Sequence, residues 1–275
     1  MAPTGTRASD TAARTPPATP ADAIAPPAVT DTPEALARLR ERGYAVVPAN
    51  VLLHGLLAGT ATPADETRAF AALATTWTSL PRDAYLRDGG RYRSRRHGCW
   101  TVDPDANRLE RAPHRAHWQP TDYNALHGGI ERWFEPIEAR VADDALFRAL
   151  LVRLGAWFGA VRRATPWYVE AHQFRIDTAE GIGRPTPEGA HRDGVDFVAV
   201  ILVNRRDVRG GETRVFDAHG PAGQRFTMAE PGSALLLDDT RVIHETTPIQ
   251  PAGAAGVRDT LVLTYRAGGF QAPVP

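Results

Sequence analysis

The sequence of 275 residues has no lysine, a single cysteine and no long run of apolar residues. Because Cys99 is alone, an internal disulfide is excluded, and such cysteine usage is typical of a reducing compartment. No segment has the apolar length that a transmembrane helix needs. The first residues also lack the basic start and apolar stretch of a secretory signal. We therefore predict a cytoplasmic protein with no membrane partner.

The charges of the chain balance, with 32 basic and 32 acidic residues. No bulk electrostatic field therefore points to nucleic acid as a partner, and the expected ligand is a small molecule. Every basic residue is arginine, so any fixed cation for an acidic ligand has to be a guanidinium. Residues 1–30 are rich in Ala, Pro and Thr, and we predict a disordered tail before one domain of residues 31–275. The oligomeric state is left open.

Two histidines and one aspartate have the spacing of a metal site. The stretch GAHRDGVDF contains His191 and Asp193, and an i, i+2 spacing on a strand points both side chains the same way. His244 ends the strand-like run SALLLDDTRVIH. Two imidazoles and one carboxylate on one face of a metal, with open positions opposite, are the donors of mononuclear non-haem iron oxygenases. We predict that His191, Asp193 and His244 bind iron(II).

Each part of this pattern also has a simpler interpretation. A His-x-Asp triplet among glycines is a weak motif by itself and is compatible with a surface turn. His244 could instead be a buried histidine paired with Asp238 or Asp239, since buried polar groups usually have a partner.

A candidate anion site follows in RDTLVLTY. Arg258 and Thr260 are i and i+2, so both face one side of the last strand, with Val262 next along that side. A guanidinium donates two parallel hydrogen bonds to a carboxylate, and a neighbouring hydroxyl adds a third. The alternative is an exposed arginine on an edge strand.

These residues lie in blocks that resemble a known family. PTPEGAHRDGVDFVAVILVNR, VRGGETRVFD, LLLDDTRVIHETTPI and RDTLVLTYR are similar to the iron(II)- and 2-oxoglutarate-dependent dioxygenases that include bacterial free-amino-acid hydroxylases, such as the isoleucine dioxygenases. The similarity extends upstream through GGRYRSRR, YNALHGGIERWF and HQFRI, and covers about residues 35–268. The order of several blocks makes it far more specific than a lone His-x-Asp.

The resemblance implies that the cofactors are iron(II), 2-oxoglutarate and O2. It implies that Arg258 binds the distal carboxylate of 2-oxoglutarate, and that the enzyme hydroxylates an unactivated C–H of a free L-amino acid, aliphatic or basic, releasing succinate and CO2. Desaturation, or a carrier-bound or peptide substrate, is an alternative on the same scaffold. An alternative of another class is a cupin-like isomerase or binding protein that does not use 2-oxoglutarate.

The sequence predicts an α+β fold, mainly β, with a double-stranded β-helix (jelly-roll, cupin-like) core. Short strands separated by Gly-rich turns run from residue 197 to the end, and no helix fits between them. We place the core at about residues 165–267. Amphipathic patterns predict flanking helices at residues 32–43, 63–79 and 143–161.

Several further residues are candidates for the pocket. Arg91 or Arg93 is predicted to pair with a substrate carboxylate, although such a charge cluster is also typical of a solvated face. On the strand WYVEAHQFRID, Gln173 is predicted to contact 2-oxoglutarate and Arg175 the substrate. The loop of residues 178–189, rich in Gly and Pro, is a candidate lid.

The region of residues 82–133 is predicted to be rich in loops. Its four histidines have spacings that suit no zinc site, so we expect structural or surface residues. They are His97, His114, His117 and His127.

Overall fold

The computed structural model describes residues 24–57, 59, 61–124, 126 and 128–273. No helix within these ranges combines the length and apolar character needed to cross a membrane. The predicted tail lies mostly outside the described residues. Its last part packs on the folded body, because the Val29 N–H donates to the Val46 carbonyl (3.0 Å) and the Val29 side chain is buried.

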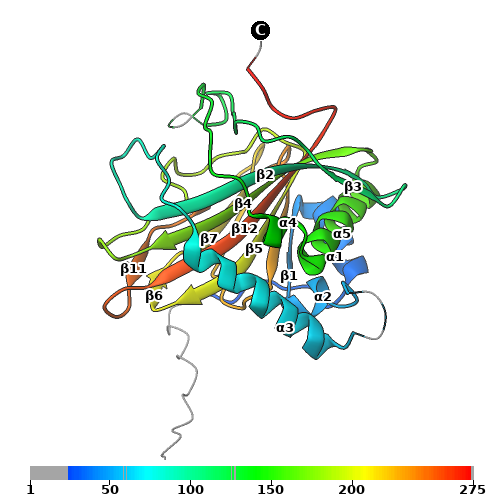
Figure 1. The fold of residues 1–275 in the computed structure, drawn as a ribbon, viewed down its shortest axis with the longest axis horizontal. Helices are drawn as coiled ribbons and strands as arrows, with labels where there is room; N and C mark the ends of the chain where they lie inside the picture. The colour runs from blue at the N-terminus through cyan, green and yellow to red at the C-terminus, as the bar shows by residue number, and fades with distance from the viewer. Residues whose placement is uncertain (1–23, 58, 60, 125, 127, 274–275) are drawn as a thin grey trace, which may run out of the picture.

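A seven-stranded antiparallel sheet forms the centre of the molecule (Figure 1). Three of its strands come from before residue 165, where the core was predicted to begin, and two of these lie in residues 82–133, which were predicted to be rich in loops. The order is β1 (Tyr44–Val47), β9 (Ala234–Asp238), β5 (Phe197–Arg206), β12 (Val257–Ala267), β4 (Trp167–Asp177), β2 (Arg93–Asp103) and β3 (Arg108–Arg111).

Two smaller antiparallel sheets lie against one face of the large sheet. A cluster of buried apolar side chains, including Val198 and Leu235 from the large sheet and Val215 and Val242 from a small one, joins the two layers. The predicted double-stranded β-helix is therefore confirmed. The small sheets are β10 (Val242–Thr246), β7 (Thr213–Asp217) and β8 (Gly223–Phe226), and then β11 (Ile249–Pro251) and β6 (Val208–Gly210).

Helices cover the other face of the large sheet (Figure 1). In α5, Leu150 and Leu154 are fully buried, and the Asp144 carboxylate caps the helix by accepting from the Phe147 N–H (2.9 Å). The helix predicted over residues 63–79 changes to a 3-10 helix part of the way along. The helices are α1 (Thr32–Arg42), α2 (Ala49–Leu52), α3 (Pro63–Ala74), η1 (Thr75–Ser79), α4 (Ala139–Ala142) and α5 (Ala145–Val161).

The register between β4 and β12 decides which side chains face the inside of the jelly roll. Phe174 pairs with Thr260 and His172 with Val262, and all four line an internal cavity. Because successive side chains of a strand alternate, the residues between them face the helices instead. The side chains that face the cavity and those that face the helices are thus on opposite sides of the same strands.

Candidate metal centre

Backbone pairing brings together the two histidines that the sequence separates. His191 and His244 form an isolated antiparallel bridge, in which each N–H donates to the other's carbonyl (3.0 and 2.9 Å). Their ring centroids lie 4.7 Å apart. His244 is on β10, whereas His191 lies in the segment that leads into β5.

The side chains of these histidines converge on Asp193. The His191 Nε2 atom lies 4.0 Å from Asp193 Oδ1, and the His244 Nε2 atom lies 3.8 Å from Asp193 Oδ2. All three ligand atoms lie within 4.8 Å of one another, so small side-chain movements would bring them to one divalent ion with bonds of about 2 Å. The Nδ1 atom of His191 is 2.9 Å from the Gly189 carbonyl, which fixes the proton there and leaves Nε2 free to bind a metal.

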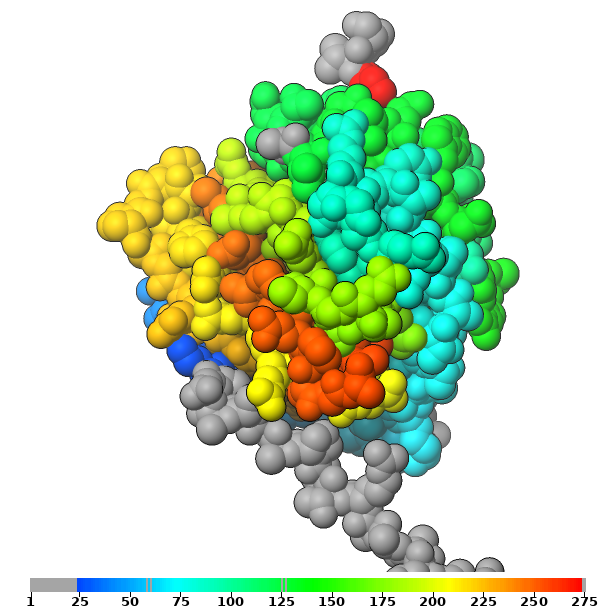
Figure 2. Space-filling view, turned by 90° about the vertical axis from the view of Figure 1, so that its left-hand side faces the viewer, coloured from blue at the N-terminus to red at the C-terminus, as the bar shows by residue number. Residues whose placement is uncertain are grey.

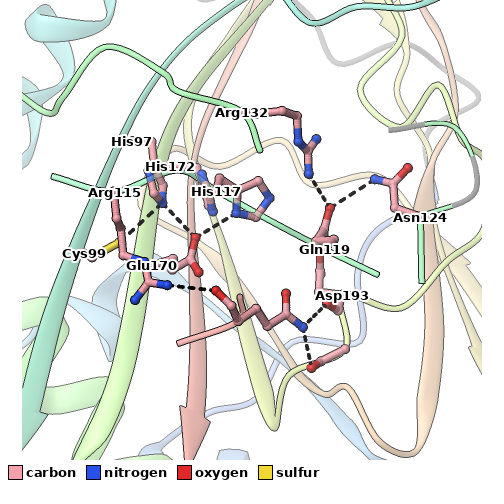
Figure 3. Close-up of polar contacts among 12 residues, drawn as sticks. His97, Cys99, Arg115, His117, Gln119, Asn124, Arg132, Glu170, His172 and Asp193 are labelled. Atoms are coloured by element: carbon pink, nitrogen blue, oxygen red, sulfur yellow. Dashed lines mark hydrogen bonds and ion pairs between the residues drawn. The ribbon is translucent and has the colours of Figure 1, made fainter. Parts of the chain in front are cut away.

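Polar neighbours hold Asp193 and its loop in place (Figure 3). The Gln119 amide donates to Asp193 Oδ1 (3.1 Å), and Gln271 donates to the backbone carbonyls of Asp193 and Gly194 (3.1 and 2.7 Å). The Asp239 carboxylate accepts the backbone N–H groups of residues 193–195 at 2.8–3.1 Å. Asp239 therefore supports the metal loop and is not the partner of His244.

The electrostatics of this cluster suit a cation. Burial raises the pKa of Asp193, and burial beside Asp193 raises the pKa of Asp239 to about 7. Burial lowers the pKa of His244. For His191, burial lowers the pKa, but the carboxylates of Asp193 and Glu188 raise it overall. A divalent ion would favour the ionised carboxylate and the neutral imidazoles, so these donors fit iron(II).

Arg258 lines the same cavity, of about 110 Å³. Its side chain is buried on a central strand, which excludes the exposed edge position considered above. The Nε and Nη2 atoms have no protein partner within the described chain. Burial lowers the pKa of Arg258 to about 10, so it is still a cation at neutral pH. With Thr260 beside it in the cavity, Arg258 is placed to receive a carboxylate.

Of the other residues predicted to lie in the pocket, some line the cavity and some do not. Arg93 lines the cavity, whereas Arg91 has a side chain 73% exposed, beside Glu180.

Gln173 and Arg175 were placed wrongly, because the alternation of β4 points them to the helix face. There Gln173 donates to the Thr76 hydroxyl (3.1 Å), and Arg175 makes a two-pronged ion pair with the Asp259 carboxylate (both 2.8 Å).

Two cavity arginines were missed. Arg95 and Arg132 are both buried and line the cavity with Arg93. The Asp83 carboxylate accepts from Arg93 Nε (2.7 Å) and lies 3.9 Å from Arg95 Nη1, so one acid serves two guanidinium groups. The signal was in the alternation of RYRSRR, which places Arg93 and Arg95 on one face once this segment is recognised as a strand.

Three of the histidines form a buried cluster with Glu170 (Figure 3). Glu170 Oε2 lies 2.8 Å from His97 Nε2 and 2.7 Å from His117 Nδ1, and Arg95 donates to His172 Nδ1 (2.7 Å). Ligands of one tetrahedral zinc ion would stand about 3.3 Å apart with bonds of about 2 Å, so these distances indicate charge-assisted hydrogen bonds.

The hydrogen bonds of this cluster indicate which ring nitrogen of His117 and of His172 carries a proton. Burial lowers the pKa of His117 to about 3, so His117 is neutral and donates from Nδ1 to Glu170. His172 accepts from Arg95 at Nδ1 and therefore carries its proton on Nε2. Both rings line the cavity. His97 and His117 are structural as expected, but His117 also contributes to the pocket; His127 lies outside the described residues.

The predicted lid segment closes one side of the cavity. Pro185, Thr186 and Glu188 line it, and Gly183 pairs with Ile249. Figure 2 shows the segment on the surface in yellow-green, between the orange β11–β12 region and the teal residues near 80–95.

Comparisons with known proteins agree with this geometry. The family model "2OG-Fe dioxygenase" matches residues 74–264. The crystal structure of a bsmA homolog from Methylobium petroleophilum PM1 is 51% identical, with 91% of this chain and 99% of that chain covered and a TM-score of 0.83. No curated protein matches the chain.

Two more distant structures share the fold. IDO from Bacillus thuringiensis is 16% identical, with a TM-score of 0.67 and coverage of 86% of this chain and 96% of that one. TqaL, an Fe(II)/α-ketoglutarate-dependent dioxygenase, is 20% identical, with a TM-score of 0.65 and coverage of 89% and 91%. The match of the family model to most of the chain, around a two-histidine, one-carboxylate cluster, shows that this protein belongs to the 2OG-Fe dioxygenase family, which uses iron(II), 2-oxoglutarate and O2.

Proposed function

We propose that His191, Asp193 and His244 bind the iron(II), and that Arg258 and Thr260 bind the distal carboxylate of 2-oxoglutarate. The observation that supports this most directly is the buried Arg258 guanidinium, which lines the cavity of the metal cluster and has two nitrogen atoms, Nε and Nη2, without a partner in the described part of the chain. When bound, iron(II) with 2-oxoglutarate and O2 supplies an oxidant able to attack an unactivated C–H, with release of succinate and CO2.

We further propose that the substrate is a free L-amino acid, aliphatic or basic, and that the reaction is hydroxylation. Arg93, Arg95 and Arg132 each keep a buried N–H without a protein partner in the described chain, so this wall can bind a substrate carboxylate. Because so reactive an oxidant attacks the nearest C–H, the residues that orient the substrate decide which carbon reacts. The segment of residues 178–189 contributes Pro185, Thr186 and Glu188 to the wall of this cavity.

The test is incubation of the protein with the twenty proteinogenic L-amino acids, iron(II) and 2-oxoglutarate, followed by mass spectrometry. We expect one amino acid to gain an oxygen atom, and Asp193→Ala to give no product, because the variant loses the only carboxylate of the proposed ligand set. A product lacking two hydrogens would make the enzyme a desaturase. Full activity of Asp193→Ala would overturn the proposed metal site, and no product from any amino acid would overturn the proposed substrate class.

A further inference from the structure

Glu188 lines the cavity but has no assigned part in binding the metal, 2-oxoglutarate or the substrate carboxylate. It lies in the lid segment, and its side chain is only 13% exposed. Its Oε1 atom is 3.6 Å from His191 Nε2, the nitrogen that faces the metal position. Its Oε2 atom is buried and has no hydrogen-bond partner within the described chain. Glu188 therefore places a carboxyl group with an unpartnered oxygen beside the proposed metal centre.

No arginine of the described chain neutralises Glu188 directly. The nearby cavity cation is Arg132, whose guanidinium donates to Gln119 Oε1 (2.9 Å) instead. Burial lowers the pKa of Arg132 to about 10, and the charges of Asp83 and Glu188 counteract this, so Glu188 and Arg132 interact through space without an ion pair. When His191 is neutral as a metal ligand, its contact with Glu188 is no ion pair. The buried Glu188 carboxylate then lacks a paired side-chain charge within the described chain, which is costly, and a cationic group of a ligand would remove that cost.

A role as a fourth metal ligand fits the chemistry less well. The two-histidine, one-carboxylate set leaves three positions open on one face of the iron. Bound iron would have to accept 2-oxoglutarate and O2 at these positions, and a further protein carboxylate would compete with them. The carboxylate of Asp193 already provides the single acid of the set.

We propose that Glu188 binds the ammonium group of the substrate and holds that group beside the metal, while the arginine wall binds the substrate carboxylate. This inference rests on the proposed function and adds how the amino acid is oriented. A zwitterion matches the charges that line the cavity, which are Glu188 from the lid segment, Arg93 and Arg95 from β2, and Arg132 from the loop region between β3 and α4. Substrates without a free amine are excluded, because Glu188 would be left buried and unpaired.

The first experiment compares two substrate pools with the wild-type protein. One pool holds the twenty L-amino acids, and the other holds the same amino acids with acetylated amines. We expect an oxygenated product only from the free amines. Equal product from both pools would overturn the role of Glu188 but leave the proposed function standing. No product from the free amino acids would overturn the proposed function itself, and this inference with it.

The second experiment uses Glu188→Gln, which keeps the size of the side chain and removes its charge. We expect the KM of the amino acid that reacts to rise about 100-fold or more, in line with the loss of a buried charge partner. Anaerobic addition of iron(II) and 2-oxoglutarate should still produce their visible absorption band, and the amino acid should perturb that band only at raised concentrations.

The matched control is Glu180→Gln, which removes a carboxylate from the same segment. Glu180 is 61% exposed and lies 3.5 Å from Arg91, outside the cavity. We expect the KM of Glu180→Gln for the amino acid to equal that of the wild type. An unchanged KM in Glu188→Gln would overturn the proposal, as would loss of the visible band in that variant, because Glu188 would then be a metal ligand.

Discussion

The two faces of the central strands differ in how their polar groups are satisfied. On the helix face of β4 and β12, Arg175 and Asp259 form a two-pronged ion pair, and Leu261 and Leu263 pack against the helices. On the cavity face of the same strands, the Arg258 guanidinium is buried with two N–H groups that no protein atom of the described chain accepts. The helix face is filled by apolar side chains and a paired charge, although Gln173 Oε1 has no hydrogen-bond partner within the described chain, whereas the cavity face holds a buried guanidinium without a partner.

We infer that the paired residues of the helix face serve stability and that the unpartnered residues of the cavity face serve ligand binding. A buried polar group without a partner costs free energy of folding, so folding alone does not favour it. In the described chain, four arginines of the cavity wall carry such groups, namely Arg93, Arg95, Arg132 and Arg258, whereas on the helix side they occur in the neutral side chains of Trp100 and Gln173. Substitutions on the two faces should therefore have different consequences, and each experiment below asks whether they do.

The largest effect is expected from Arg258→Ala. Loss of a buried charge partner costs about 3–5 kcal/mol, so the KM for 2-oxoglutarate should rise by a factor of hundreds to thousands. The comparison is Arg175→Met on the opposite face, which should lower the free energy of unfolding and leave that KM unchanged. Steady-state succinate release and urea denaturation measure the two quantities. An unchanged KM in Arg258→Ala would move the 2-oxoglutarate anchor elsewhere.

A change in the helix layer should act on stability alone. Leu150 is fully buried on α5, and Leu150→Ala removes packing and leaves a cavity, which costs about 3 kcal/mol of unfolding free energy. The KM values for 2-oxoglutarate and for the amino acid should stay as in the wild type at temperatures where the variant is folded. A selective rise of either KM would show that the two faces are coupled.

The smallest effect concerns the pH dependence of stability. Burial lowers the pKa of His117 to about 3, from about 6.5 in the unfolded chain. Between these values the unfolded state binds one more proton, so the contribution of His117 to stability falls as the pH falls from about 6.5. The slope is about 1.4 kcal/mol per pH unit.

His117→Gln removes this titration. Urea denaturation between pH 6.5 and 4.5 should therefore give a shallower loss of stability than in the wild type, by about that slope. Parallel curves for the two proteins would mean that His117 is protonated in the folded state, and its donation to Glu170 would then need another explanation.

The sequence determined the parts of this protein that depend on local periodicity. Strand-like patterns predicted β4, β5, β9 and β12, and an amphipathic pattern over residues 143–161 predicted α5. The i, i+2 spacing placed Arg258 and Thr260 on one side of β12, and it predicted that His191 and Asp193, in the segment before β5, point the same way. The family resemblance then linked these pairs to iron and 2-oxoglutarate.

Only the tertiary structure decided which face of each strand lines the cavity and which distant side chains meet there. Alternation shows that His172 and Gln173 point in opposite directions, but not which of them points inward, because that depends on where the helices pack. For this reason Gln173 and Arg175 were assigned to the wrong face. The partners of the site, such as Gln119 and Asp239 around Asp193, come from segments whose contacts arise from long-range strand pairing, which local spacing does not encode.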